Sequence, residues 1–139
     1  MTRDEKRARE AGLRYADDQL ASDQLHHWIW EDLREGQEME ERDPSSIAPG
    51  FETKNLARDK RAAMRLAKNM LEQIRWDISR DISDSDVKPY LDAAGVEGRM
   101  SRALRDAFSN AVREVLSGDA AETWLAEEYI MPIAKGMLG

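Results

Sequence analysis

Apolar residues recur every three or four positions along most of this chain, which is the spacing of one face of an α-helix. The clearest pattern runs over residues 54–80, where the apolar face comprises Leu56, Ala63, Met64, Ala67, Met70, Leu71, Ile74 and Ile78. The same spacing predicts helices over about residues 3–20, 22–41, 54–80, 85–94 and 99–117, with a sixth from residue 119 onward. β-Branched and aromatic residues are sparse, so the pattern favours an all-α fold.

Turn-forming residues separate the predicted helices. The Asp-Pro-Ser-Ser and Pro-Gly sequences over residues 43–53 indicate a loop. We expect Ser85 or Asp86 to begin the short fourth helix, and Pro132 to kink or end the sixth. Residues 1–10 are dominated by charge, and we expect this end to fray.

Length and composition narrow the class of protein. A chain of 139 residues suits one domain, which we expect to be a single compact bundle of five or six helices around the long helix over 54–80. The absence of cysteine excludes a disulfide scaffold, a zinc ribbon and a thiol nucleophile. No apolar run reaches about 18 residues and no secretory signal is visible, so we expect a cytoplasmic protein without a membrane span.

The formal net charge of −7 hides a strong segregation of sign. Residues 15–43 carry a net charge of −8, whereas residues 52–76 carry +4. At about 100° per residue, three carboxylates of the second helix form an acidic ridge: Glu31, Glu35 and Glu38. Five bases of the third helix form a basic ridge: Lys54, Arg58, Arg61, Arg65 and Lys68. Either these ridges face each other or solvent in a packed bundle, or one of them contacts a partner.

The signatures of common catalytic sites are missing. Asp23, His27, Glu31 and Glu35 follow one another at four-residue spacing, but no second helix offers a Glu-x-x-His set to complete a metal site. The sequence contains no Gly-x-Ser-x-Gly nucleophile and no phosphate-binding glycine loop. We therefore expect a protein that is not an enzyme and has no metal or cofactor.

For some residues of the second helix, the helical spacing leaves open whether the side chain is buried or exposed. Trp28 falls on the apolar face with Ile29, whereas Trp30 projects away from it and is either covered or exposed as an anchor for a partner. Asp32 falls on the apolar side, where it either lies at the edge or meets an arginine.

A short segment resembles a known family. Residues 70–77 read Met-Leu-Glu-Gln-Ile-Arg-Trp-Asp and are followed by an Arg-Asp pair at 80–81. This run is similar to a segment of the Ocr-type antirestriction proteins of phages, which implies an acidic, all-helical, dimeric DNA mimic. The carboxylates that would carry such mimicry are those of the second helix and Asp77, Asp81, Asp84, Asp86 and Asp92.

The leading hypothesis is a small acidic protein that binds a protein partner, as a phage-type inhibitor of a host defence or host enzyme complex. The acidic ridge and Trp30 would form the contact. The alternative is a nucleic-acid-binding or virion assembly protein that uses the basic ridge. The apolar tail over residues 130–138 would either cover the core or join two copies in a homodimer.

Overall fold

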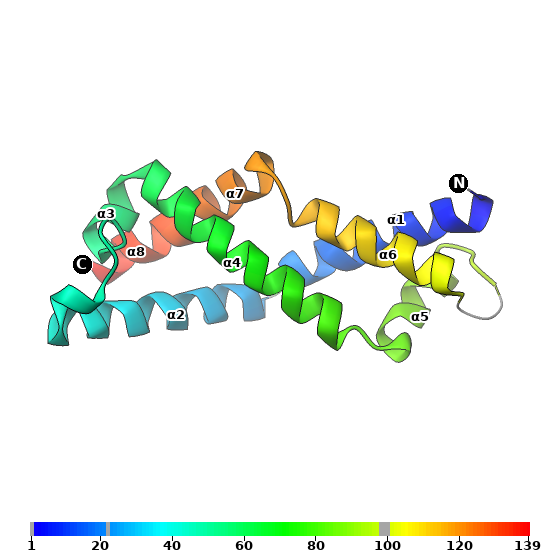
Figure 1. The fold of residues 1–139 in the computed structure, drawn as a ribbon, viewed down its shortest axis with the longest axis horizontal. Coiled ribbons are helices and arrows are strands. Elements are labelled where there is room, and N and C mark those ends of the chain that lie inside the picture. The colour runs from blue at the N-terminus through cyan, green and yellow to red at the C-terminus, as the bar shows by residue number, and fades with distance from the viewer. Residues whose placement is uncertain (1, 22, 98–100) are drawn as a thin grey trace. The chain divides into compact units, whose positions relative to one another are not determined.

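The computed structural model describes residues 2–21, 23–97 and 101–139, and the side chains of all of these except 23 and 78–81. Every regular element in these ranges is helical, which confirms the all-α fold class (Figure 1). The elements are α1 (Arg3–Leu20), α2 (Asp23–Arg42), the 3-10 helix η1 (Pro44–Ser46), α3 (Thr53–Arg58), α4 (Lys60–Asp81), α5 (Asp84–Ala93), α6 (Arg102–Val115), α7 (Asp119–Leu125), the π-helical segment η2 (Ala126–Ile130) and α8 (Met131–Met137). Within the described ranges, no helix combines the length and the hydropathy that a membrane span requires.

The helices group into two compact units. Unit 1 comprises residues 1–21 and 72–117, and unit 2 comprises residues 22–71 and 118–139. Helix α4 contributes its first half to unit 2 and its second half to unit 1. The expectation that the whole chain forms a single bundle around this helix stays a prediction.

Unit 1 is built on the pairing of α1 with α6, and α5 also packs against α1 (Figure 1). Phe108 is fully buried, and the Tyr15 ring lies 5.5 Å from the Phe108 ring and 5.2 Å from the Tyr90 ring. The Tyr90 hydroxyl donates a hydrogen bond of 2.7 Å to Asp18, which raises the pKa of Tyr90 to about 12. Aromatic packing therefore joins α1 to both α5 and α6, and the hydrogen bond of Tyr90 adds to the contact with α5.

The first turns of α1 are helical from Arg3 onward and are tied to the rest of unit 1. The Thr2 hydroxyl accepts a hydrogen bond from the Glu5 N–H. Arg7 donates to the Gly95 carbonyl at 2.9 Å, and Arg9 forms an ion pair with Glu114 at 2.8 Å. The expected fraying of residues 1–10 concerns motion and stays a prediction.

Unit 2 places α2 against α3, η2 and α8, and α3 also packs on α8. Ile29 of α2 is fully buried with Leu125 of α7 and Ile130 of η2. Lys60 at the start of α4 forms an ion pair of 2.7 Å with Glu127 of η2. Contacts between segments distant in sequence therefore close this unit.

The helix predicted over residues 54–80 is two helices, because Asp59 interrupts it. The backbone of Asp59 is extended (φ −99°, ψ 105°). Its carboxylate accepts a hydrogen bond of 2.9 Å from the Arg61 N–H, and its carbonyl accepts one of 3.0 Å from the Ala63 N–H. Asp59 is thus the N-cap of α4, a position that aspartate strongly favours.

One further boundary differs from the sequence-based expectation, and one of the two alternatives for Pro132 is ruled out. Helix α5 begins after Ser83 rather than at Ser85 or Asp86, because Ser83 and Asp86 form a reciprocal capping box. Pro132 does not end the last helical run, which continues to Met137. The run passes through the π-helical turn η2 just before the proline, in which the Met131 N–H bonds to the Ala126 carbonyl. Such a turn accommodates a residue that lacks an N–H and would crowd the preceding carbonyls.

Candidate interaction surface on helix α2

The acidic ridge lies on the outer face of α2. Glu31, Glu35 and Glu38 are all exposed, while Ile29 and Leu33 on the other side of the helix are buried in unit 2. The burial of one face of α2 therefore directs the three carboxylates toward solvent.

Two of these carboxylates, Glu31 and Glu38, have partners on α2 itself. Glu31 lies 2.9 Å from the imidazole Nε2 of His27, and Glu38 lies 3.4 Å from Nε of Arg34. Among the described residues, no ion pair joins the acidic ridge to the basic ridge. No described ion pair therefore supports the alternative in which the two ridges face each other.

Large apolar side chains flank the acidic ridge. Trp28 is 36% exposed, Trp30 is 40% exposed and Met39 is 43% exposed. At about 100° per residue, Trp28 and Met39 lie within about 40° of Glu35, whereas Trp30 lies about 80° from Glu38 on the other side of the ridge. Trp28 was expected on the buried face with Ile29; it lies instead at the margin of that face, where an indole ring is only partly covered. The sequence analysis did not single out Met39 as part of a site.

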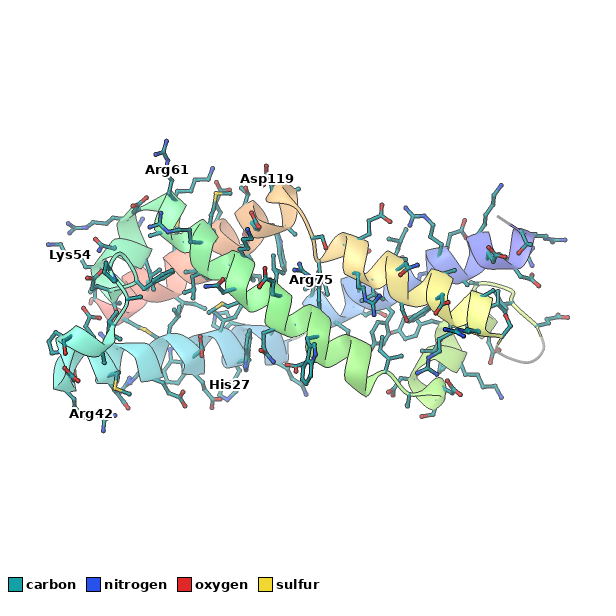
Figure 2. The ribbon with its side chains drawn as sticks, in the orientation of Figure 1. His27, Arg42, Lys54, Arg61, Arg75 and Asp119 are labelled. Carbon is teal, nitrogen blue, oxygen red and sulfur yellow. The ribbon has the colours of Figure 1, made fainter. Side chains whose placement is uncertain are left out.

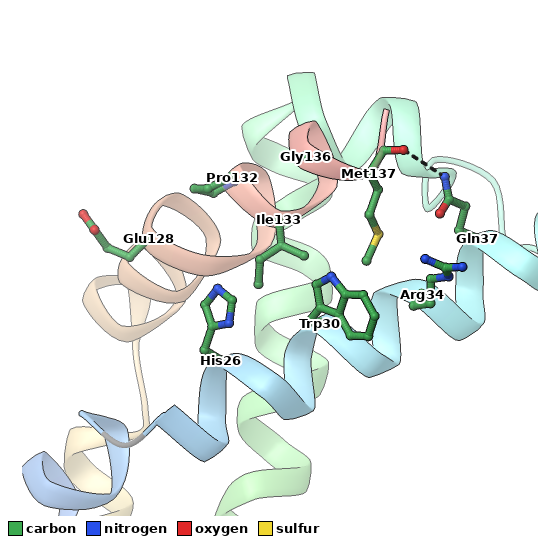
Figure 3. A pocket seen from close by; sticks show the side chains of 9 residues that line it. All are labelled: His26, Trp30, Arg34, Gln37, Glu128, Pro132, Ile133, Gly136 and Met137. Carbon is green, nitrogen blue, oxygen red and sulfur yellow. Dashed lines mark hydrogen bonds between the residues drawn. The ribbon is translucent and has the colours of Figure 1, made fainter. Parts of the chain in front are cut away.

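Trp30 lines an open groove of about 520 Å³ between α2 and the η2–α8 segment (Figure 3). The guanidinium carbon of Arg34 lies 5.8 Å from the Trp30 ring centroid, within range of a cation–π contact. Gln37 donates a hydrogen bond of 3.3 Å to the Met137 carbonyl, which ties α2 to the end of α8 (Figure 3). The indole is therefore held at the rim of a groove that it does not fill.

A second, smaller cavity of about 200 Å³ lies on another side of α2. Its walls come from α2, the 46–53 segment, α3 and α4, and they comprise Asp32, Leu33, Gly36, Ser46, Ile47, Ala48, Phe51, Thr53, Leu56 and Leu66. Partial burial raises the pKa of Asp32, and this carboxylate has no hydrogen bond or ion pair with any described residue. Asp32 thus lies at the edge of the apolar side and does not meet an arginine, and periodicity alone could not reveal the cavity beside it.

The five bases of the basic ridge are exposed, but they do not share one helix. Lys54 and Arg58 belong to α3, and the break at Asp59 separates them from the others on α4. Figure 2 shows Lys54 and Arg61 projecting outward from the two helices. The helical-wheel argument that aligned all five bases along one helix is therefore wrong.

Three of the five carboxylates that the family resemblance singled out in unit 1 have local structural roles. Asp77 accepts a hydrogen bond of 3.1 Å from Gln73, Asp84 pairs with Arg105, and Asp86 belongs to the capping box of α5. Asp92 is exposed, and the side chain of Asp81 lies outside the described residues.

The apolar tail covers the core of unit 2. Ile130 and Ala134 are fully buried and Ile133 is nearly so, whereas Leu138 at the end of the tail is half exposed. These buried side chains are not available to a second copy, and a homodimer through residues 130–138 stays a prediction that would have to use Leu138 and its neighbours.

The described residues bring together no group of three or more His, Asp and Glu side chains that could hold a metal ion. Of the four-residue series considered for a metal, the side chain of Asp23 lies outside the described set. Comparisons of this chain with protein-family models, with curated proteins and with solved structures find no match.

Proposed function

We propose that this chain is a non-enzymatic protein that binds a protein partner through the outer face of α2. One observation supports this function above others. Of the five large apolar side chains that are exposed in the described part of the chain, three lie on α2 around the acidic ridge: Trp28, Trp30 and Met39. Exposed aromatic and methionine side chains beside charges are typical of binding surfaces.

The chemistry of this face favours a partner with a basic surface. The three carboxylates of the ridge would steer such a partner, and Trp30 at its groove would act as the anchor. The resemblance of residues 70–81 to the antirestriction proteins makes a host defence or host enzyme complex the first class of partner to test. The chain would then act as an inhibitor in the host cytoplasm.

The test is affinity capture from the lysate of the native host, with and without nuclease treatment, followed by mass spectrometry. The ridge variant replaces Glu31, Glu35 and Glu38 with lysine. The matched control replaces Glu10, Asp17 and Asp106 with lysine, because these acids are exposed in unit 1 and the change in net charge is the same.

We expect a protein partner that survives nuclease treatment, is lost with the ridge variant and is kept with the control. Capture that is unchanged by the ridge variant, or lost equally with both variants, would remove α2 as the binding surface.

Nucleic acid is the second candidate partner, and one observation favours it. The bases of the basic ridge are exposed, and none of them forms an ion pair with a described acid. Arg65 lies 6.0 Å from the Phe51 ring centroid, within range of a cation–π contact, and the exposed charges could contact phosphates, as a nucleic-acid-binding or virion assembly protein would require. Capture that disappears on nuclease treatment and weakens steeply with salt would support this candidate over the first.

A further inference from the structure

The proposed function assigns no role to the smaller cavity beside α2. Most of its lining is aliphatic or aromatic, with Leu33 on α2 facing Ile47, Phe51 and Leu56 across a space of about 200 Å³. Asp32 is the only charged residue among those that line it.

Hydrogen bonds hold the far wall of this cavity in place. The Glu40 carboxylate accepts hydrogen bonds from the Thr53 N–H at 3.1 Å and from the Thr53 hydroxyl at 3.0 Å, which ties the start of α3 to α2. Glu52 accepts hydrogen bonds from the Gly50 N–H at 3.0 Å and from the Asn55 amide at 2.7 Å. These hydrogen bonds fix the position of the wall, and they already occupy the nearby carboxylates of Glu40 and Glu52.

Asp32 differs from these two carboxylates because no described residue pairs with it. The Asp32 side chain is exposed, so its negative charge is available to a cation that enters the cavity it lines. The cavity therefore favours a ligand that combines one positive charge with an apolar body.

A lysine side chain fits this combination better than an arginine does. Its four methylene groups match the aliphatic walls, and its ammonium is a compact charge that one carboxylate can satisfy together with water. A guanidinium has five N–H groups to satisfy. Only three polar side chains of the lining could accept hydrogen bonds from these groups: Asp32, Ser46 and Thr53.

We propose that this cavity receives a lysine side chain of the protein partner, with the methylene stem against Leu33, Ile47 and Phe51 and the ammonium on Asp32. The inference rests on the proposed function, because it assigns to the basic partner one defined contact on α2. Asp32 and Glu35 are both exposed and three residues apart on α2, which makes them neighbours on the helix surface, so one partner surface can reach both the ridge and the cavity.

The test needs no knowledge of the partner. Nα-acetyl-lysine N-methylamide is titrated into the ¹⁵N-labelled full chain at constant ionic strength, and the backbone amide shifts are followed by NMR. The matched probe is the norleucine analogue, which keeps the four-carbon stem and lacks the ammonium. Asp32→Asn removes the charge at nearly constant shape, and Glu41→Gln removes an exposed charge of α2 outside the cavity.

We expect saturable shifts at Leu33, Gly36, Ile47 and Phe51, and an affinity that falls about tenfold or more in Asp32→Asn or with the norleucine probe. Glu41→Gln should leave the affinity unchanged. Shifts spread evenly over the surface, or equal affinities for Asp32→Asn and the original chain, would overturn the proposal.

The two proposals fail in different ways. If the lysine probe binds at the cavity but the ridge variant still captures the partner, the acidic ridge is not the docking surface and the cavity binds lysine independently of it. If the ridge variant loses the partner but the probe does not bind at the cavity, the lysine site is wrong and the docking surface stands.

Discussion

Gly12 shows how much can depend on one hydrogen atom in place of a methyl group. This residue is buried where α1 meets α6, and a Cβ added to it would lie 2.4 Å from the Phe108 carbonyl oxygen. We predict that Gly12→Ala lowers the free energy of unfolding by about 1–3 kcal/mol, because the two backbones must separate. This effect should outweigh the better helix propensity of alanine, which is about 1 kcal/mol. Chemical denaturation followed by far-ultraviolet circular dichroism measures the change.

Gly36 provides the matched control for this substitution. It also lies inside a long helix, but a Cβ added there meets no atom within 4 Å. Gly36→Ala should therefore raise the free energy of unfolding by roughly 0.5–1 kcal/mol. A destabilisation of similar size in both variants would contradict the close approach at Gly12. The sequence alone could not separate these two glycines, since both interrupt a helical pattern in the same way and only the neighbouring helix differs.

At the scale of the elements, hydrophobic spacing predicted where helices lie and missed where single side chains end or bend them. Leu56 and Ala63 are seven residues apart, so the helical spacing continues across Asp59 although the helix does not. The periodicity reports burial of a face, whereas the break depends on a local cap and on the docking of α3 against α8. For the same reason the acidic ridge could be predicted, but the cavity beside Asp32 could not, because segments distant in sequence form its walls.

The cap at Asp59 is testable by itself. We predict that Asp59→Ala lowers the free energy of unfolding by about 1 kcal/mol, because the Arg61 N–H loses its acceptor at the start of α4. Asp59→Asn should keep nearly all of the stability, because an asparagine side chain accepts the same hydrogen bond. Denaturant titrations of the two variants and the original chain give the comparison. An asparagine variant as unstable as the alanine variant would show that the charge of Asp59, rather than its cap, matters.

At the scale of the whole molecule, charge is segregated along the chain but contributes little to the stability of the fold. The side-chain pairs that involve the acidic ridge are exposed pairs within α2, and the ion pair of Arg34 with Glu38 is of a kind that contributes about 0.3–0.5 kcal/mol. The core of each unit is apolar, with Phe108 in unit 1 and Ile29 in unit 2 fully buried. The net charge of −7 is therefore a property of the surface that a partner would meet.

Salt should accordingly separate stability from binding. We predict that raising sodium chloride to about 1 M, where the Debye length is about 3 Å, changes the free energy of unfolding by less than about 1 kcal/mol. The same salt should weaken the binding of a basic partner to α2 by slowing association, and replacement of Glu31, Glu35 and Glu38 with glutamine should remove most of that dependence. Denaturant titrations and binding kinetics at several salt concentrations measure the two effects.

A loss of stability greater than about 2 kcal/mol in salt would mean that the acidic and basic ridges neutralise each other in solution, since only a network of pairs is screened to that extent. The acidic ridge on the outer face of α2 would then be engaged in stabilising the fold. It could not at the same time be the free surface that binds a partner.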